Sequence, residues 1–492
     1  MKDLKQKAIR GGFAKVCAQA ANFVLRLASV MILARLLTPR DFGLVGMVTA
    51  LTGVLGLFRD FGLSSAAIQR ANVTEEQVST LFWINVLVGA ILAVLTVFMA
   101  PVISAFYREP RLLGVTAVLG VGFLFNAAGV QHGAMLQRQM RFTVVAALDT
   151  LALVLSILVG IGMALRGYGH WSLVGMTLTA PLVSTVGAWI ATAWIPGLTR
   201  NWEGIRSMMR FGGTITLNSL VVYIGYNLEK VLLGRYWGAD VVGIYGRAYQ
   251  LTNIPTDNLN SSIGGVAFSA LSRVQDDPQR LKSYFLKGYS LVLALTLPIT
   301  IVCTLFANDA ILVLLGQKWK EAIPIFRLLA PTILIFAMIN PFSWLLFSIG
   351  LVGRSLKIAL VIAPLVITAT IIGLPYGPKG VAFAYSTAMT LWVVPHIAWC
   401  VHGTMVSVRD VFQALSRPLL SGIVAGALTF ALQFSYGPML PPLARLLVGV
   451  GLFMCMYLGM LLFVMGQKAF YVNLVRGLRR RSSVEENALA SA

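Results

Sequence analysis

Long apolar runs separated by short polar segments make up most of this chain. A membrane-spanning helix needs about 20 mostly apolar residues, and the pattern predicts roughly fourteen such helices. Those of the first half are predicted near Gly11–Leu36, Phe42–Phe61, Leu81–Ile103, Leu112–Val130, Val144–Leu165 and Trp171–Ala193. The others are predicted near Phe211–Leu233, Val241–Leu271, Phe285–Phe306, Ile323–Phe347, Leu356–Leu374, Val381–Val401, Val411–Phe434 and Leu443–Gly466. The predicted fold class is an all-α polytopic membrane protein.

Composition explains what covers these helices. The 492 residues are 58% hydrophobic and only 12% charged, about half the charged fraction of a typical soluble protein. There is too little polar surface for a water-soluble protein of this size, so lipid must cover the apolar faces.

The distribution of positive charge predicts the topology. The net charge is +21, and the cations form short clusters between apolar runs, which is the positive-inside pattern rather than a nucleic-acid-binding surface. Both termini are predicted to be cytoplasmic. No cleavable signal is expected after the basic segment Met1–Arg10, and the basic tail after Gly466 is expected to lie against anionic headgroups.

The chain contains a weak internal repeat. Arg35, Gly43 and Gly46 recur as Arg235, Gly243 and Gly246, with each pair 200 positions apart (235 against 35). The repeat divides the first twelve predicted helices into two sets of six, and the substrate site of a duplicated transporter lies between its halves. The predicted divisions are therefore a first lobe over residues 1–200, a second lobe over 201–405, two extra helices over 406–466 and a cytoplasmic tail over 467–492.

Polar residues line one face of the first predicted helix. Lys15, Gln19, Asn22 and Arg26 are spaced by four, three and four residues, which places them on one narrow face. Snorkelling toward the headgroups would explain Lys15 but not the deeper Arg26. We therefore expect Arg26 to line a cavity.

The second and seventh predicted helices carry similar groups. Arg59 either lines the same cavity or, with Asp60 beside it, lies at the cytoplasmic rim. The seventh helix has a polar stripe in which Glu229 is positioned to neutralise a neighbouring lysine. The members of this stripe proposed to contact substrate are Tyr223, Tyr226, Asn227 and Lys230. Tyrosine hydroxyls suit the faces of sugars, although tyrosines near helix ends are also common interface anchors.

The eighth predicted helix carries Arg247 and Asp257 among other polar residues, and Pro255 is expected to interrupt and kink it. A broken polar helix at membrane depth is typical of substrate or ion sites in transporters. Asp149 and Asp257 are candidates for coupling to an ion, while a hydrogen-bonded structural aspartate is an equal alternative for Asp149. The predicted cavity is more cationic than anionic and suits a phosphate or diphosphate.

Catalytic chemistry is not predicted. The sequence contains no phosphate-binding G-x-x-x-x-G-K-[ST] loop, no H-E-x-x-H motif and no serine nucleophile elbow. The four cysteines and four histidines have no metal-ligand spacing. No catalytic residue, metal or cofactor is expected.

Several stretches resemble a known family. LARLLTPRDFGLVGMV, FRDFGLSSAAIQR and STLFWINVLVG, with the later IPTDNLNSSIGGVAFSALSRVQDD and LLGQKWKEAIPIFRLL, are similar to the polysaccharide transporter branch of the multidrug/oligosaccharidyl-lipid/polysaccharide exporter superfamily. The similarity is to its colanic-acid-exporter type of oligosaccharide flippase. It covers most of the chain, is strongest to about Val88, and rests on a run of matches rather than one signature.

This resemblance implies a flippase rather than an enzyme. The implied fold is two six-helix lobes plus two extra helices, and the implied substrate is an undecaprenyl-diphosphate-linked oligosaccharide moved by alternating access for exopolysaccharide or lipopolysaccharide synthesis. The implied partners are this lipid-linked oligosaccharide, membrane lipids and the polysaccharide polymerase machinery.

Two other functions remain open at this stage. A drug-cation antiporter of the same superfamily would need a surplus of carboxylates in the cavity, which the excess of Arg and Lys disfavours. A membrane-embedded polysaccharide polymerase or ligase should present a large outer loop, and no predicted outer loop approaches that size.

Overall fold

The computed structural model describes residues 21–59, 74–197, 205–436 and 440–468, which form helices and connecting turns without a strand. Within this part of the chain, ten helices are long and apolar enough to cross a membrane. The all-α polytopic fold is therefore confirmed, and the count of fourteen spans stays a prediction. Lys15, the start of the first predicted helix and most of the tail lie outside the described residues.

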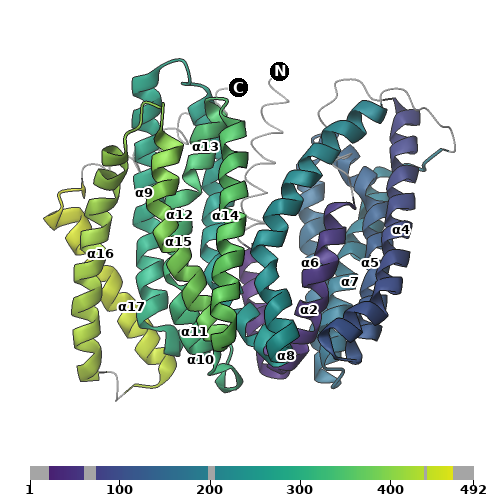
Figure 1. Cartoon of the computed structure of the whole chain (residues 1–492), viewed down its shortest axis with the longest axis horizontal. Coiled ribbons are helices and arrows are strands. Elements are labelled where there is room, and N and C mark those ends of the chain that lie inside the picture. The colour runs from purple at the N-terminus through teal and green to yellow at the C-terminus, as the bar shows by residue number, and fades with distance from the viewer. Residues whose placement is uncertain (1–20, 60–73, 198–204, 437–439, 469–492) are drawn as a thin grey trace, which may run out of the picture. The chain divides into compact units, whose positions relative to one another are not determined.

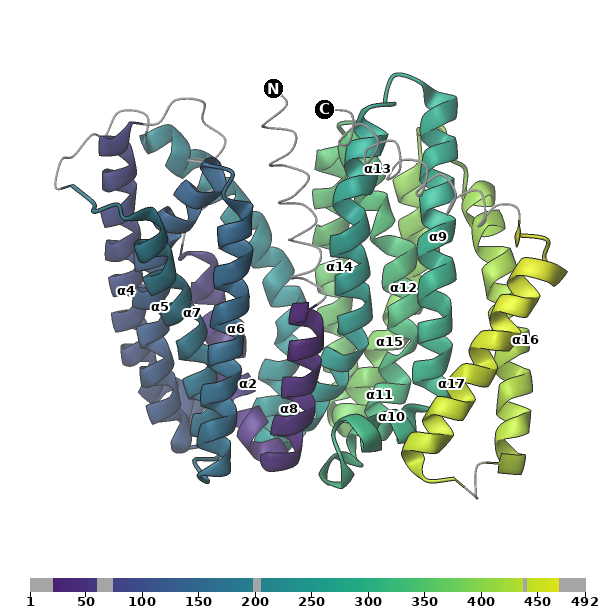
Figure 2. The same ribbon diagram turned by 180° about the vertical axis from the view of Figure 1, so that it is seen from behind.

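The described chain forms two compact units (Figures 1 and 2). Unit 1 comprises residues 1–247, 314–320 and 359–381, and unit 2 comprises residues 248–313, 321–358 and 382–492. Three long helices, α8 (Ile205–Ser272), α14 (Val352–Gly373) and α15 (Gly377–Val401), contribute residues to both units, as does the last residue of the short helix α10 (Ala307–Leu314). The lobe boundary predicted near residue 200 stays a prediction.

Unit 1 includes a helix over residues 21–36, followed in the described chain by five helices, of which α4, α5, α6 and α7 lie side by side in both views (Figures 1 and 2). Its helices are α2 (Pro39–Leu57), α4 (Glu75–Tyr107), α5 (Arg111–Arg138), α6 (Phe142–Leu165) and α7 (His170–Thr192), with the 3-10 turns η1 (Gln317–Trp319) and η2 (Leu374–Tyr376). Capping boxes fix two helix starts, because Thr38 pairs with Asp41 and Thr74 with Gln77.

Small residues hold these helices close together. A side chain at Gly129 of α5 would strike Thr185 of α7, whose hydroxyl donates to the Phe125 carbonyl at 2.6 Å. Trp189 donates its indole N–H to the Ala128 carbonyl at 2.8 Å. Close backbone approach at small residues, with hydrogen bonds to carbonyls, is how helices associate where water cannot drive them together.

Unit 2 contains the remaining helices. These are α9 (Pro278–Leu305), α10 (Ala307–Leu314), α11 (Ala322–Leu329), α12 (Pro331–Ile339), α13 (Pro341–Ser348), α16 (Val408–Tyr436), α17 (Pro442–Gly459) and the π-helical η4 (Met460–Val464). Helices α11, α12 and α13 together form one apolar span over Ala322–Ser348, as predicted near Ile323–Phe347; a helical hydrogen bond is missing at Pro331 and at Pro341, because proline has no N–H to donate.

The two C-terminal helices pack onto α9. Gly422 of α16 lies directly against Leu297, and the Tyr457 hydroxyl of α17 donates to the Ala294 carbonyl at 2.9 Å. Phe453 and Ala425 complete this buried cluster. The predicted pair of extra helices thus forms part of unit 2.

The interruption predicted at Pro255 is wrong. The segment labelled α8 contains two helices that meet at a kink at Gly238, with φ of 86° and ψ of −179°, in agreement with the turn predicted between Leu233 and Val241; the second helix continues through Pro255. Neighbouring groups in a membrane helix can satisfy the carbonyl that proline frees. In contrast, a positive φ with extended ψ is open to glycine and costly for residues with a Cβ.

Candidate functional site

The polar stripe of α8 meets α2 within unit 1 at Tyr223. The Tyr223 hydroxyl donates to the Thr49 carbonyl at 3.0 Å, and the Tyr223 ring fills the space beside Gly53. One turn along α8, Asn227 donates its amide N–H to the Tyr223 carbonyl at 3.1 Å, and the Lys230 Nζ donates to the Asn227 Oδ1 at 3.0 Å. The structure therefore joins three of the predicted stripe residues into one ladder.

Glu229 is the most unusual member of this region. Its side chain is only 2% exposed, yet neither carboxylate oxygen accepts a hydrogen bond from a described residue. Lys230, the next residue, supplies an electrostatic attraction. A buried carboxylate without hydrogen bonds is costly and is usually retained for function. The sequence indicated its charge but not its burial.

Arg59 lies at the end of α2 and faces α5. Its Nη1 donates to the Asn126 Oδ1 at 2.9 Å, and Asn126 in turn donates to the Gly122 carbonyl at 2.8 Å. The Arg59 Nε is buried and donates to no described residue. The guanidinium therefore donates one hydrogen bond to α5, and its Nε–H has no acceptor among the described residues.

The two candidates on the first helix differ in exposure. Arg26 is exposed, whereas Asn22 is partly buried and its Oδ1 accepts no hydrogen bond from the described part of the chain. Both lie in unit 1 with the α8 ladder. Their predicted role in binding substrate stays a prediction.

Arg247 occupies a second cluster of unit 1. Its guanidinium carbon lies 3.9 Å from the centre of the Phe42 ring, and the Trp319 ring meets Phe42 edge-on at 5.4 Å. Sequence reasoning did not identify Phe42 or Trp319. A tryptophan within the short polar segment QKWK was the available signal.

The two ion-coupling candidates lie in different units. Asp149 is an exposed residue of α6 in unit 1, and Asp257 is an exposed residue of α8 in unit 2. Tyr226 is partly buried on α8, one turn before Lys230. Their functional roles remain predictions.

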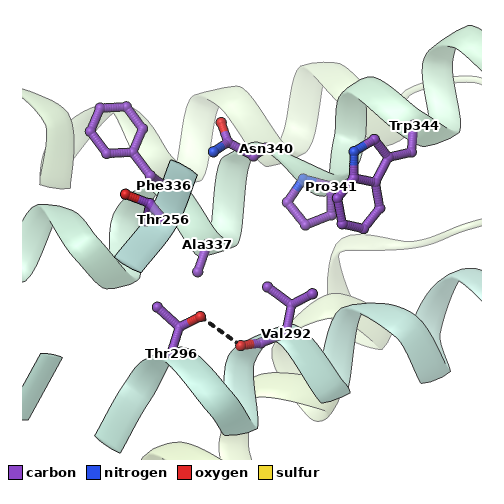
Figure 3. Close-up of a pocket in the computed structure, with 8 residues that line it drawn as sticks. All are labelled: Thr256, Val292, Thr296, Phe336, Ala337, Asn340, Pro341 and Trp344. Carbon is purple, nitrogen blue, oxygen red and sulfur yellow. Dashed lines mark hydrogen bonds between the residues drawn. The ribbon is translucent and has the colours of Figure 1, made fainter. Parts of the chain in front are cut away.

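A small pocket in unit 2 lies where α12 gives way to α13 at Pro341 (Figure 3). Its polar side chains are those of Thr256, Thr296 and Asn340, and the Thr296 hydroxyl donates to its own helix at the Val292 carbonyl, 2.7 Å away. None of its eight lining residues is charged, so this pocket is unsuited to holding a diphosphate.

Comparisons with known proteins give a consistent picture. The family model described as polysaccharide biosynthesis protein matches residues 32–324. The lipopolysaccharide biosynthesis protein WzxC of Escherichia coli K12 is 27% identical over 376 residues, covering 75% of this chain and 76% of WzxC.

Two solved structures share the fold. The lipid II flippase MurJ in an inward closed conformation matches with a TM-score of 0.76 and 14% identity, over 94% of this chain and 99% of MurJ. An inward-facing multidrug transporter of the MATE family matches with a TM-score of 0.63 and 15% identity, over 79% of this chain and 97% of the transporter. Both likenesses concern the fold alone.

Proposed function

This chain belongs to the family of polysaccharide biosynthesis proteins, and we propose that it is a membrane transporter that flips an undecaprenyl-diphosphate-linked oligosaccharide repeat unit. The proposed direction is from the inner to the outer leaflet of a bacterial inner membrane, with both termini cytoplasmic. The repeat unit would feed exopolysaccharide or lipopolysaccharide synthesis. WzxC, which is named for lipopolysaccharide biosynthesis, supports this class of substrate.

The ladder of Tyr223, Asn227 and Lys230 is the observation that carries the proposal. It sets a cation, an amide and an aromatic ring in sequence along one face of α8. A cation attracts a diphosphate strongly where lipid and protein exclude water, and amides and aromatic rings are suited to sugars. The headgroup of a lipid-linked oligosaccharide contains both a diphosphate and sugars.

The proposed transport follows alternating access. Lys15, Arg26 and Arg59 receive the diphosphate from the inner leaflet, and Lys230 and Arg247 hold it as the path opens outward. Asn22 lies on the same helical face as Arg26, while Tyr223, Tyr226 and Asn227 line the sugar path. Asp149 and Asp257 are the proposed ion-coupling residues, and a polysaccharide polymerase is the proposed downstream partner.

The two alternative functions are less well supported. A drug-cation antiporter is consistent with the MATE fold, but this fold is shared with MurJ and does not distinguish the two. A polymerase or ligase is disfavoured because one relative, 25% identical over 316 residues, is named the succinoglycan biosynthesis transport protein ExoT of Rhizobium meliloti.

Deletion of the gene tests the function directly. Lipid-linked intermediates are extracted, and the leaflet that holds them is determined with a membrane-impermeant reagent that oxidises sugars. We expect complete repeat units to accumulate in the cytoplasmic leaflet. Complete but unpolymerised units in the outer leaflet would instead indicate a polymerase or ligase, and normal polysaccharide without intermediates would favour drug efflux.

A substitution in the ladder tests the site. Lys230→Met should reduce complementation of the deletion strain at least about tenfold, because a loss of ~1.4 kcal/mol of substrate attraction corresponds to that factor. Lys287→Met, at an exposed position of α9, is the matched control and should complement fully. Equal complementation by both variants, at equal membrane levels, would remove Lys230 from the site.

A further inference from the structure

The two halves of the repeat meet at their glycines. A Cβ added to Gly43 of α2 would strike the carbonyl oxygen of Ala239, and a Cβ added to Gly243 of α8 would strike the carbonyl oxygen of Pro39. The members of each equivalent pair, 39 with 239 and 43 with 243, are 200 positions apart. When position i touches j and the equivalent of j touches the equivalent of i, the contact has twofold character. The repeat seen in the sequence is thus a physical contact.

This crossing brings two backbones together without side chains between them. Both contacts are van der Waals contacts at glycine, which permits the closest approach of membrane helices. A sugar or diphosphate cannot pass between helices in such contact. Because no side chains interlock at these two glycines, the contact can also be separated and remade.

A tryptophan carried on a separate segment secures the same region. Residues 314–320 belong to unit 1, although residues on both sides of this segment belong to unit 2. Trp319 is fully buried, and its indole N–H donates to the Ala34 carbonyl at 2.8 Å. Beside it, the Lys318 Nζ donates to the Arg35 carbonyl at 3.2 Å.

Phe42 connects the tryptophan to the crossing. It is the neighbour of Gly43, is 6% exposed, and lies between the Trp319 ring and the Arg247 guanidinium. Arg247 is itself four residues beyond Gly243 on α8. The aromatic and cationic contacts therefore surround the same point at which the two glycines meet.

We propose that the Gly43–Gly243 crossing is a gate across the transport path and that Trp319 is the latch that keeps it shut. The proposal rests on the proposed function, since a gate matters only to a transporter. In the predicted orientation, the turn after the first helix faces outward, so the gate closes the outer end. Opening requires α2 to part from α8 and Trp319 to leave Ala34.

The twofold character makes a specific prediction. A side chain at either glycine meets a backbone carbonyl, so Gly43→Val and Gly243→Val should hold the gate open to a similar degree. Gly246→Val is the matched control, because a Cβ at this position of the same helix meets no atom within 4 Å. Trp319→Ala should open the gate by removing the latch, without placing a new side chain between the two helices.

Cysteine labelling measures the gate without any substrate. The full chain carries Thr49→Cys in a background lacking Cys17, Cys303, Cys400 and Cys455. Thr49 is exposed and lies less than two turns along α2 from Gly43. A membrane-impermeant maleimide is applied from each side of the membrane in turn, and only protein that remains monodisperse in detergent is counted.

We expect labelling from the outer side to rise several-fold in Gly43→Val, Gly243→Val and Trp319→Ala and to stay at the parental level in Gly246→Val. Equal labelling of the two glycine variants and the control would overturn the proposal. If both glycine variants fail to fold, Trp319→Ala decides it by the same criterion.

A reversible cross-link supplies the converse measurement. Cysteines at Arg35 and Lys318 are joined by a short bismaleimide that contains a cleavable disulfide. The joined protein should stop export, and reduction should restore it, whereas undiminished export by fully joined protein would overturn the latch. If labelling follows the prediction but the deletion strain accumulates no cytoplasmic lipid-linked units, the gate stands and the proposed function fails.

Discussion

Two buried carboxylates, one in each unit, differ in how their charge is compensated. Glu229 and Asp309 are both only 2% exposed. Asp309 accepts hydrogen bonds from the Arg445 Nε at 3.0 Å and from its Nη2 at 2.6 Å, which joins α10 to α17 in a two-pronged ion pair. Glu229 accepts none from a described residue.

The difference separates a charge that is fixed by a partner from one that is not. Arginine in a forked geometry satisfies a carboxylate fully, so the Asp309 pair acts as a fixed joint between helices. The Glu229 carboxylate keeps its hydrogen-bonding capacity unused beside the Lys230 ladder. Burial alone does not distinguish the two groups, whereas their partners do.

Arg445→Met should have the largest effect on stability, because it leaves the Asp309 carboxylate buried and unpaired. Removing one partner of a buried pair costs roughly 3–5 kcal/mol, and the lower end applies because the Arg445 side chain is 23% exposed. Thermal unfolding of the purified protein in detergent measures the loss. The double variant Asp309→Asn with Arg445→Met should recover part of it, and an unchanged unfolding temperature in the single variant would show that the joint is dispensable.

Glu229→Gln should affect export much more than stability. The amide has the same shape, and no hydrogen bond from a described residue is lost, so the unfolding temperature should stay equal or rise. Export should fall about tenfold, corresponding to ~1.4 kcal/mol in the transport barrier. Glu321→Gln, at an exposed position of unit 2, is the control. Full export by Glu229→Gln would show that the Glu229 charge is not needed for transport.

Lys282→Gln should have the smallest effect. Its Nζ lies 2.6 Å from the Asp410 Oδ2, but the two side chains are 36% and 21% exposed. Exposed pairs contribute about 0–1 kcal/mol because water and salt screen them. The same unfolding assay at low and high salt should show a small loss that salt abolishes. A loss as large as that of Arg445→Met would mean that exposure does not separate the two ion pairs.

The sequence by itself determined the class of fold and much of the polar face. Apolar runs of spanning length are a direct consequence of a lipid solvent, so the polytopic helical fold could be predicted without knowing any contact. The spacing of Tyr223, Asn227 and Lys230 follows from helical periodicity, and their placement on one face is confirmed. The 200-residue offset between Gly43 and Gly243 was also visible as a repeat.

Only the tertiary structure decided which of these residues meet and which charges are compensated. Trp319 donates to Ala34, Arg445 pairs with Asp309, and Glu229 has no such partner; each fact depends on residues distant in sequence. The turn predicted between the seventh and eighth helices is confirmed at Gly238, whereas Pro255, a strong local signal, lies inside the following helix without interrupting it. Local patterns report what a segment can form, whereas partners and breaks depend on the neighbours that packing supplies.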